Sequence, residues 1–343
     1  MDNCCVLAGR IWSGDVFEDG YVTVNNGKIE DVQYGKYNGF PDFKGCIFPG
    51  IVDTHTHVAD AGLKIDKRYS IEELVAPPLG LKHEYLNKTS PDKVRMSITS
   101  YINTLHKKGV SRIIDFREGG VKGSAVLRTL FPESIILGRP LSENFDVNEI
   151  DDILNHADGI GISSISDMNH GYIDAIAEEV HRRKKMLALH VSERIREDID
   201  YVISLKPNFV VHMVHATNAD IAKCVDNNIS ISVCPRSNLY FGVKAPVNSM
   251  INVGANVSIG TDNAMLTPDS DIFNEARIFY KLLSVTNREK GETFRSLIAR
   301  GRELLNENSA LEKMIGKNVD IVAIPCREEH ILANGCANLV RFY

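Results

Sequence analysis

Two histidines stand at the end of a short apolar run near the start of the chain. The run covers residues 47–52, and His55 and His57 follow it. On a strand, side chains two residues apart point to the same side, so both imidazoles would converge on one point. Neutral imidazole is the commonest metal ligand, and two on one strand provide half of a tetrahedral site. Taken alone, the pattern also fits a strand end with two incidental polar residues.

Three more residues of metal-ligand type end later apolar runs. They are His190 after 186–189, His212 after 209–211, and Asp262 after 257–261. A histidine or aspartate at one strand end is commonplace, but five such side chains at four strand ends are not. The sequence therefore indicates one site, provided that the fold brings these strand ends together.

The middle of the chain, residues 48–316, has the pattern of such a fold. Short apolar runs occur at 51–57, 112–116, 135–139, 159–163, 186–191, 208–212, 229–234 and 257–261. Stretches of helical periodicity separate them, as at 94–105 and 173–180. Apolar strands that alternate with amphipathic helices indicate a parallel sheet, and eight such units predict a (β/α)8 TIM barrel. Active sites of such barrels are built at the C-terminal ends of the strands, where the five side chains stand.

The two ends of the chain have a different pattern, of short strands and turns. Residues 5–9 and 20–24 are typical of strands, and Asn25-Asn26-Gly27 predicts a tight hairpin turn before 28–32. Residues 319–325 and 337–342 are strand-like too. We therefore predict an α/β protein with a small β-sandwich domain from residues 1–47 and 317–343, and a barrel from residues 48–316.

The composition argues against several kinds of partner. A net charge of −6 and a pI near 6.0 disfavour nucleic acid and anionic membranes. We expect no signal peptide and no membrane span, because no basic start precedes an apolar core and no apolar run is long enough. Seven cysteines without a Cys-x-x-Cys pair are typical of reduced thiols. The expectation is a cytoplasmic protein with a small-molecule substrate, and a homo-oligomer stays open.

The residues at these strand ends resemble motifs of the amidohydrolase superfamily, and within it those of the deaminase and chlorohydrolase (ATZ/TRZ-like) branch. The matching segments are Pro49–His57, His190–Glu193, His212–His215, Cys234–Leu239 with Ala245–Val247, and Gly260–Asn263. The resemblance covers nearly the whole chain, because a small β domain built from both termini is also typical of these enzymes.

The resemblance implies roles for the five ligand-type residues. One divalent metal ion would be bound by His55, His57, His190 and Asp262. Such a donor set suits Zn²⁺, although Fe²⁺ would accept it too. Asp262 would also take a proton from the attacking water, and His212 would hydrogen-bond the developing oxyanion. The metal-bridging lysine of binuclear members is absent from 159–164, so we expect a single ion.

Glu193 lies three residues beyond His190. In the deaminases that the sequence resembles, a glutamate at this spacing protonates a ring nitrogen and passes the proton to the leaving amine. Such a donor is needed because an amine departs poorly as an anion. Alternatively, Glu193 could stand at the N-terminus of a helix over 194–200, where the helix dipole favours an acidic residue.

Four further residues are candidates for substrate contacts: Glu84, Arg117, His170 and His215. Glu84 lies in the long connection between the first two barrel strands, where the family often has a substrate-binding acid. Arg117 follows the second strand and could instead pair with Asp115 or Glu118, and His215 could instead start a helix. His170 stands where adenosine-type deaminases of this branch have a His-x-Pro-Tyr segment, which this sequence lacks.

The pattern and the resemblance together predict a metal-dependent hydrolase that acts on a non-peptide C–N bond. Our hypothesis is a hydrolytic deaminase of a nucleobase-, nucleoside- or pterin-like heterocyclic amine. The alternative with the same groups is a hydrolase that opens a cyclic amide or imidazolone ring. Two more distant alternatives are a non-catalytic relative, which would be expected to lose metal ligands, and a phosphoesterase barrel, which Glu193 and the Gly-Thr-Asp segment disfavour.

Overall fold

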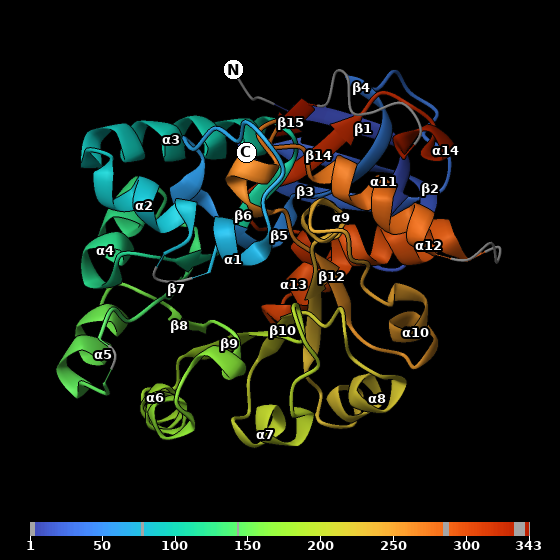
Figure 1. Cartoon of the computed structure of the whole chain (residues 1–343). Coiled ribbons are helices and arrows are strands. Elements are labelled where there is room, and N and C mark those ends of the chain that lie inside the picture. Colours follow the sequence, from blue (N-terminus) through green and yellow to red (C-terminus); the bar gives the residue numbers. More distant parts are fainter. Residues whose placement is uncertain (1–3, 77–78, 143, 284–287, 333–339, 343) are drawn as a thin grey trace. The chain divides into compact units, whose positions relative to one another are not determined.

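The computed structural model describes residues 4–76, 79–142, 144–283, 288–332 and 340–342 (Figure 1). The chain divides into two compact units. One consists of Met1–Val52, Leu105–Ser111 and Asp271–Tyr343, and the other of Asp53–Thr104 and Arg112–Ser270. The domain boundaries expected near residues 47 and 317 stay a prediction.

A nine-stranded sheet forms the barrel. Its strands, in spatial order, are β12 (Val257–Ile259), β11 (Ser230–Val233), β10 (Phe209–His212), β9 (Met186–Val191), β8 (Gly159–Ile162), β7 (Ile135–Gly138), β6 (Val110–Arg117), β5 (Ile51–His57) and β13 (Asp262–Asn263). The strand pairs with a defined register run parallel, as βαβ connections require. All eight predicted runs form strands, so the predicted TIM-like α/β fold is confirmed.

The short strand β13 brings the two ends of this sheet together. It follows β12 after Gly260 and Thr261, and it pairs with the end of β5. The link passes so close to β5 that a Cβ atom on Gly260 would lie 2.7 Å from the Cβ of His55. Glycine is therefore required at this position, which gives a physical reason for the Gly260-Thr261-Asp262 sequence.

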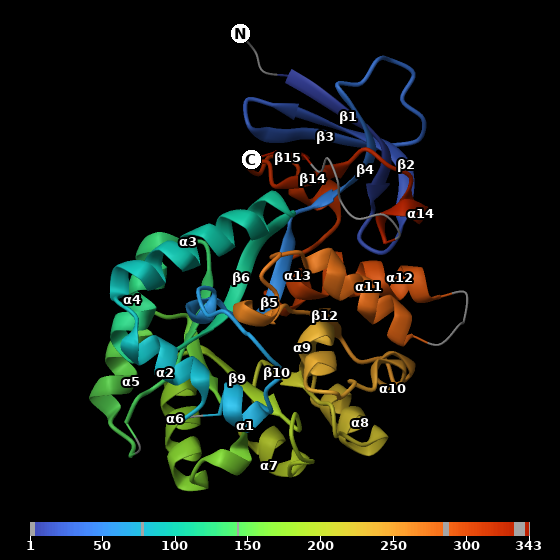
Figure 2. The same cartoon turned by 45° about the horizontal axis from the view of Figure 1, so that its top comes forward.

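Helices follow most of the barrel strands and lie along the outside of the sheet (Figure 2). They are α4 (Gly120–Leu130), α5 (Val147–Leu154), α6 (His170–Arg182), α7 (Ile199–Ser204), α8 (Asn218–Asp226), α9 (Pro235–Tyr240) and α10 (Val247–Asn252), with 3-10 turns η2 (Ile165–Asp167) and η3 (Ala264–Leu266). The helix predicted from the spacing within 173–180 is α6. It buries Ile173, Ile176 and Val180 on one face.

The long connection from β5 to β6 is mostly helical. It contains η1 (Val58–Asp60), α1 (Ile71–Leu74), α2 (Leu81–Lys88) and α3 (Pro91–Lys107). The helix predicted within 94–105 is α3, and Ile98 and Ile102 on it are fully buried. A capping box starts α1, where the Ser70 side chain accepts a hydrogen bond from the backbone N–H of Glu73. These elements position the side chains that this connection contributes to the site.

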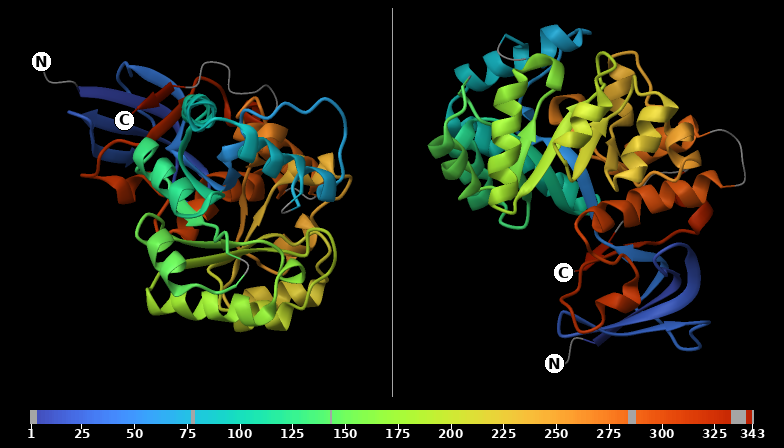
Figure 3. Two further views of the ribbon diagram at one scale, coloured as in Figure 1. Left: turned by 60° about the vertical axis from the view of Figure 1, so that its left-hand side comes forward. Right: turned by 90° about the horizontal axis from the view of Figure 1, so that it is seen from below.

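One mixed sheet dominates the other unit (Figure 3). Its strand order is β15 (Val340–Phe342), β14 (Ile321–Ile324), β4 (Phe43–Pro49), β1 (Cys4–Trp12), β2 (Phe17–Asn25) and β3 (Lys28–Tyr34). Strands from both ends of the chain thus lie side by side, as predicted, with β14 antiparallel to β4. Of the predicted strand over 337–342, residues 337–339 lie outside the described residues.

The remaining helices belong to this unit as well. They are α11 (Ile272–Leu282), α12 (Glu289–Phe294), the π-helical turn η4 (Arg295–Ala299), α13 (Arg300–Leu304), η5 (Leu311–Met314) and α14 (Glu328–Ile331). Among the helices of the described ranges, none has the length and apolar character needed to cross a membrane.

The apolar face of the mixed sheet packs on the segment around η5. Leu7, Val22 and Ile47 of the sheet form one buried cluster with Leu311 and Met314. This segment takes the place of a second sheet, so the small β domain is a single mixed sheet where we expected a sandwich.

The predicted hairpin turn joins β2 and β3. Its two central residues, Asn26 and Gly27, both have positive φ, at 50° and 73°. A type I′ turn requires this conformation, and Asn-Gly is its favoured sequence.

Candidate metal centre

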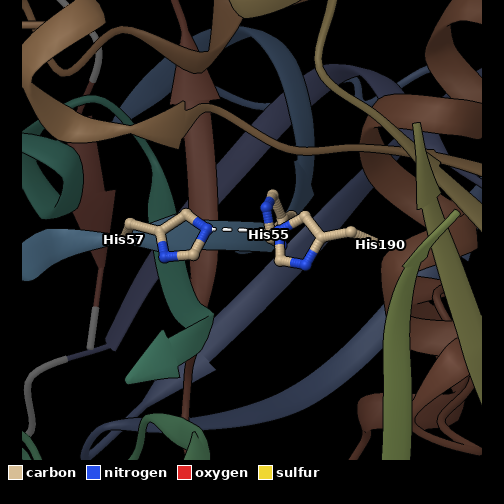
Figure 4. Close-up of side chains that lie close together, drawn as sticks. All are labelled: His55, His57 and His190. Carbon is tan, nitrogen blue, oxygen red and sulfur yellow. Dashed lines mark hydrogen bonds between the residues drawn. The ribbon is translucent and has the colours of Figure 1, made fainter. Parts of the chain in front are cut away.

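Three imidazole rings converge at the C-terminal end of the barrel (Figure 4). His55 and His57 project from the end of β5, and His190 comes from β9. One ring nitrogen from each lies within 4.8 Å of the others. The Nε2 atoms of His57 and His190 are 3.3 Å apart. The convergence expected from the spacing of these histidines is therefore present.

The hydrogen bonds on the far side of two rings fix which nitrogen carries the proton. His190 Nδ1 lies 3.0 Å from the carbonyl oxygen of Ile162, and His57 Nδ1 lies 3.0 Å from that of Phe116. A carbonyl oxygen only accepts, so Nδ1 is the protonated nitrogen in both rings. The two Nε2 atoms then face each other, an arrangement that a cation bound by both would stabilise.

His55 has no such outer partner. Its side chain is fully buried, and neither ring nitrogen has a hydrogen-bond partner within the described part of the chain. Burial lowers the pKa of His55 to about 3, so the ring is neutral at physiological pH. A buried, neutral imidazole whose ring nitrogens make no hydrogen bond is costly unless it binds something. The donor set therefore fits a divalent metal ion.

His212 and Asp262 complete the cluster. Ligand atoms of these two residues and of His55 also lie within 4.8 Å of one another. Asp262 Oδ1 is 3.3 Å from His55 Nε2. Burial opposes the charge of Asp262, but its contact with His55 and the neighbouring histidines hold its pKa well below the usual range. Three imidazoles with a carboxylate are ligands that Zn²⁺ and Fe²⁺ accept.

The segment after β11 orients these two side chains. Ser237 Oγ donates to Asp262 Oδ2 at 2.5 Å, and the Asn238 amide donates to His212 Nδ1 at 3.2 Å. Because Nδ1 of His212 accepts, its proton is on Nε2, which points towards the cluster. This explains in physical terms why the Cys234–Leu239 segment accompanies the metal-ligand residues.

The backbone is strained where the site residues leave their strands. The φ angles of His212, Asp262 and Ser192 are 75°, 63° and 52°, in the left-handed region. Such residues cost of order 1–3 kcal/mol each and concentrate at functional sites.

Two buried aspartates hold the strand ends in place. Asp53 accepts hydrogen bonds from the backbone N–H and the hydroxyl of Thr261, at 3.0 and 2.7 Å. Asp115 accepts from the hydroxyl of Thr56 at 2.8 Å and from the backbone N–H of Val58 at 2.8 Å. Asp53 therefore fixes the backbone that leads into Asp262, and Asp115 fixes the segment that carries His55 and His57.

Glu193 lies beside this cluster, on the loop after β9. Its Oε2 is 3.6 Å from His212 Nε2, and its side chain is 17% exposed. Burial raises the pKa of Glu193 above its ordinary value, although His212 opposes the shift. The alternative of a helix-start glutamate is wrong, because residues 194–198 are not helical and α7 begins at Ile199 after its N-cap Asp198.

A buried ion network that sequence reasoning missed adjoins His57. Glu118 Oε1 lies 2.8 Å from His57 Nδ1 and forms an ion pair with Lys82. Lys82 Nζ is also 3.6 Å from Asp60 Oδ2 and 3.1 Å from Asn263 Oδ1. Burial disfavours the charge on Lys82, but Glu118 and Asp60 together raise its pKa. No local sequence signal marks this network, because α2 is only weakly amphipathic and its buried residue, Lys82, is charged.

One cavity joins the cluster to the solvent side of the barrel. Its lining includes His57, Lys82, Arg139, Ser163, His190, Glu193, His212, Asp262 and Asn263. The expected metal-ligand and acid–base residues are therefore brought together, with His55 beneath this lining.

The four candidates for substrate contacts do not line this cavity. Glu84 is on the exposed face of α2 and pairs with Lys88, and His170 stacks on Tyr201 at the start of α6. His215 is exposed on the loop before α8. Arg117 is buried, and its Nε donates to the carbonyl oxygen of Gly123 at 3.0 Å.

The chain is similar to proteins of known family. Residues 46–299 match the Amidohydrolase family. An uncharacterized protein of Methanocaldococcus jannaschii is 32% identical over 292 residues, which cover 75% of this chain and 76% of that protein. A 5-methylthioadenosine/S-adenosylhomocysteine deaminase of Bacillus cereus is 25% identical over 368 aligned positions, with 92% of this chain and 83% of that protein covered.

Solved structures of the same fold include enzymes with zinc. An adenosine deaminase from Xanthomonas campestris with bound zinc superposes with a TM-score of 0.74 at 17% identity, over 93% of this chain and 84% of that chain. An atrazine chlorohydrolase from Arthrobacter aurescens, complexed with zinc, gives 0.73 at 14% identity, over 93% and 87%. The fold is therefore shared with deaminases and chlorohydrolases. Since the family match covers most of the chain, barrel and histidine cluster included, the protein belongs to the amidohydrolase family.

Proposed function

We propose that this protein is a metal-dependent hydrolase that deaminates a heterocyclic amine. The observation that carries the proposal is the position of two carboxyl groups on one histidine cluster. Glu193 and Asp262 both line the cavity, near His212, and their pKa values are shifted in opposite directions. Such a pair can supply one proton acceptor and one proton donor in the same turnover.

The metal would be held by His55, His57, His190 and Asp262. When bound there, a divalent ion such as Zn²⁺ would act as a Lewis acid and provide a nucleophilic water at neutral pH. Zinc in two enzymes of the same fold, and the buried ring nitrogens of His55 that make no hydrogen bond, support this assignment. All these donors belong to one cluster, which favours a single ion.

The chain's own groups would then move the protons. Asp262 would accept a proton from the attacking water on a carboxylate oxygen. His212, whose Nε2 carries a proton, would hydrogen-bond the oxygen that adds to the ring carbon. Glu193 would give its proton to the ring nitrogen beside that carbon.

The second half of the reaction needs a proton on the leaving group. The added hydroxyl would give its proton to the Glu193 carboxylate, which would pass it to the exocyclic nitrogen, so that the C–N bond breaks with release of ammonia and the ring keeps a carbonyl oxygen. The proton that Asp262 took from water would then restore the acid form of Glu193. Glu193 is suited to this transfer because burial keeps its carboxyl group ready to hold a proton. The net reaction consumes one water and yields one ammonia per turnover.

Two points favour deamination over ring opening. The protein is 25% identical to a deaminase over most of both chains, and Glu193 lines the cavity beside His212, which supports a role as proton donor to a ring nitrogen. The zinc-loaded protein should be incubated with a panel of aminated purines, pyrimidines, their nucleosides and pterins while ammonia is measured. Ammonia release with the keto product is the expected result, and ring-opened acids without ammonia would replace deamination by the alternative.

A further inference from the structure

A second cavity lies at the carboxyl ends of β6 and β7, beside the one that holds the histidine cluster. Its lining includes Arg95, Arg117, Gly119, Lys122, Gly123 and Arg139, and we refer to it as the arginine cavity. It measures about 520 Å³, compared with about 90 Å³ for the first cavity. The larger volume could hold a substituent that the narrow cavity at the cluster could not.

The arginine cavity is strongly cationic. Three arginines and Lys122 line it, and Glu118 is the one acidic residue in the part of its lining that the structure describes. The charge of that carboxylate is already balanced, because it forms an ion pair with Lys82 and contacts His57. The uncompensated charge of the cavity is therefore positive, which favours an anionic ligand.

Arg117 is one of the buried side chains that line this cavity. Its side chain is 4% exposed, and its Nε is fixed by a hydrogen bond to the carbonyl oxygen of Gly123. Its Nη1 is buried without a hydrogen-bond partner among the residues described. A buried guanidinium N–H without a partner is unfavourable, and an oxyanion is the partner that its geometry suits best.

The N-terminus of α4 faces the same space. This eleven-residue helix begins after Gly119, which has a φ of 91°, and no side chain caps it. A Cβ atom on Gly123 would lie 2.0 Å from the carbonyl oxygen of Glu118, so the turn needs glycine. The first N–H groups of a helix have no partner within it, and they attract anions together with the helix dipole.

Arg139 connects the two cavities, since it lines both. Its backbone N–H donates to the carbonyl oxygen of Arg117 at 3.0 Å, and its guanidinium is 3.5 Å from the hydroxyl of Ser163. We propose that the arginine cavity binds an anionic substituent, a phosphate or a carboxylate, of the heterocyclic amine that reacts at the histidine cluster. The proposal rests on the proposed function only in taking the two cavities to serve one substrate.

The first experiment is a calorimetric titration of the zinc-loaded protein with inorganic phosphate. Arg117→Met should weaken binding about tenfold or more, because a charge-assisted pair is lost. Lys122→Met, on the exposed start of α4, should weaken it less and keep the fold intact. Arg183→Met, a half-buried arginine just after the end of α6, should bind like the wild type. If phosphate binds the Arg117 and Lys122 variants as tightly as the wild type, the phosphate is bound to the metal or is an adventitious ion only. Either result would overturn the proposal.

The second experiment compares matched pairs of amines that differ in charge. Adenosine with AMP, cytidine with CMP, and a neutral pterin with its carboxylated form separate phosphate from carboxylate as the anion. The anionic member should have the lower KM, and Arg117→Met should raise that KM at least about tenfold while the neutral member is unaffected. Phosphate should compete with the anionic substrate. Phosphate binding without competition would show a separate effector site and contradict the substrate assignment.

The two experiments also distinguish a failure of the proposed function from a failure of the cavity proposal. If no compound releases ammonia, the proposed function is wrong, but the phosphate titration still decides whether the arginine cavity binds an anion. If Arg117 has no effect on that titration, the cavity proposal fails whatever the panel yields.

Discussion

The Nε2 atoms of His57 and His190 face each other across 3.3 Å, while both Nδ1 atoms are turned to carbonyl oxygens. Removal of the metal should therefore leave these buried ring nitrogens without the ion that they share, and destabilise the fold. We expect about one divalent ion per chain, and a melting temperature that falls after chelation and recovers with Zn²⁺.

Elemental analysis and differential scanning calorimetry would check this expectation. His57→Ala should lose the ion, whereas His215→Ala, on an exposed loop, should keep it. Two tightly bound ions per chain would contradict the single-ion assignment.

Substitution of Glu193 by glutamine should reduce turnover by about 10²-fold or more, because the amide cannot deliver a proton to the ring nitrogen or the amine. The metal content and the fold should stay unchanged. Glu84→Gln, at an exposed position on α2, is the matched control and should behave like the wild type. Near-normal turnover of Glu193→Gln under saturating substrate would remove Glu193 from the mechanism.

Two lysines of α2 should differ sharply in their contribution to stability. Lys82 is buried against Glu118 and Asp60, so Lys82→Met would leave two buried carboxylates without their partner, at a cost of about 3–5 kcal/mol. Lys88 pairs with Glu84 on the surface, where the loss should be below about 1 kcal/mol. Urea unfolding of the two variants would measure both values. Equal effects would mean that the buried network is not important for the fold.

The contribution of Asp220 to stability should depend on pH. Its carboxylate accepts hydrogen bonds from Arg196 and, in the capping box that starts α8, from the backbone N–H of Thr217. The hydrogen bond from Arg196 is the largest cause of its lowered pKa. A carboxylate whose pKa is lowered by folding stabilises the folded state at any pH above the ordinary pKa of an aspartate. This stabilisation is lost as the pH falls through the pKa of the folded state. Asp220→Asn should therefore destabilise the protein at pH 7, by about 1 kcal/mol for the cap.

The difference between wild type and Asp220→Asn should shrink below about pH 4. Unfolding by urea at pH 7 and pH 3 would test this. A difference that is constant with pH would mean that the charge of Asp220 contributes nothing.

Both ends of the chain should be needed for a soluble product. A chain that ends at residue 316 lacks β14, which pairs with β4, and it would expose the apolar side chains of Val22 and Ile47 that pack with Ile321. We expect aggregation in size-exclusion chromatography. A soluble barrel with a cooperative unfolding transition would show instead that the terminal strands are an independent appendage.

The strands and the residues at their ends could be predicted because both signals are local. An apolar run that stops at a histidine or aspartate, as at His190 and His212, identifies the strand and the end at which the side chain emerges. The eight-unit pattern then implies that these ends meet.

Lys82 and Glu118 could not be predicted in the same way, because a charged residue in a helix or after a strand is usually exposed. Only the fold shows that α2 turns Lys82 inward to meet Glu118 and turns Glu84 outward. Arg117 was expected to contact substrate or a neighbouring carboxylate, and its place in a cavity beside that of the histidine cluster could likewise not be predicted. The sheet of the small domain was predictable from its strands, but its packing on Leu311 and Met314 was not, since those residues lie far away in sequence.

The two-residue strand β13 has a consequence for when the protein can first act during its synthesis. It closes the barrel against β5, and it carries Asp262. A growing chain that has produced all four histidines of the cluster still has an open barrel and no carboxylate in place. Hydrolytic competence should therefore be acquired in one step, at closure, so that a partly synthesised chain cannot act on metabolites.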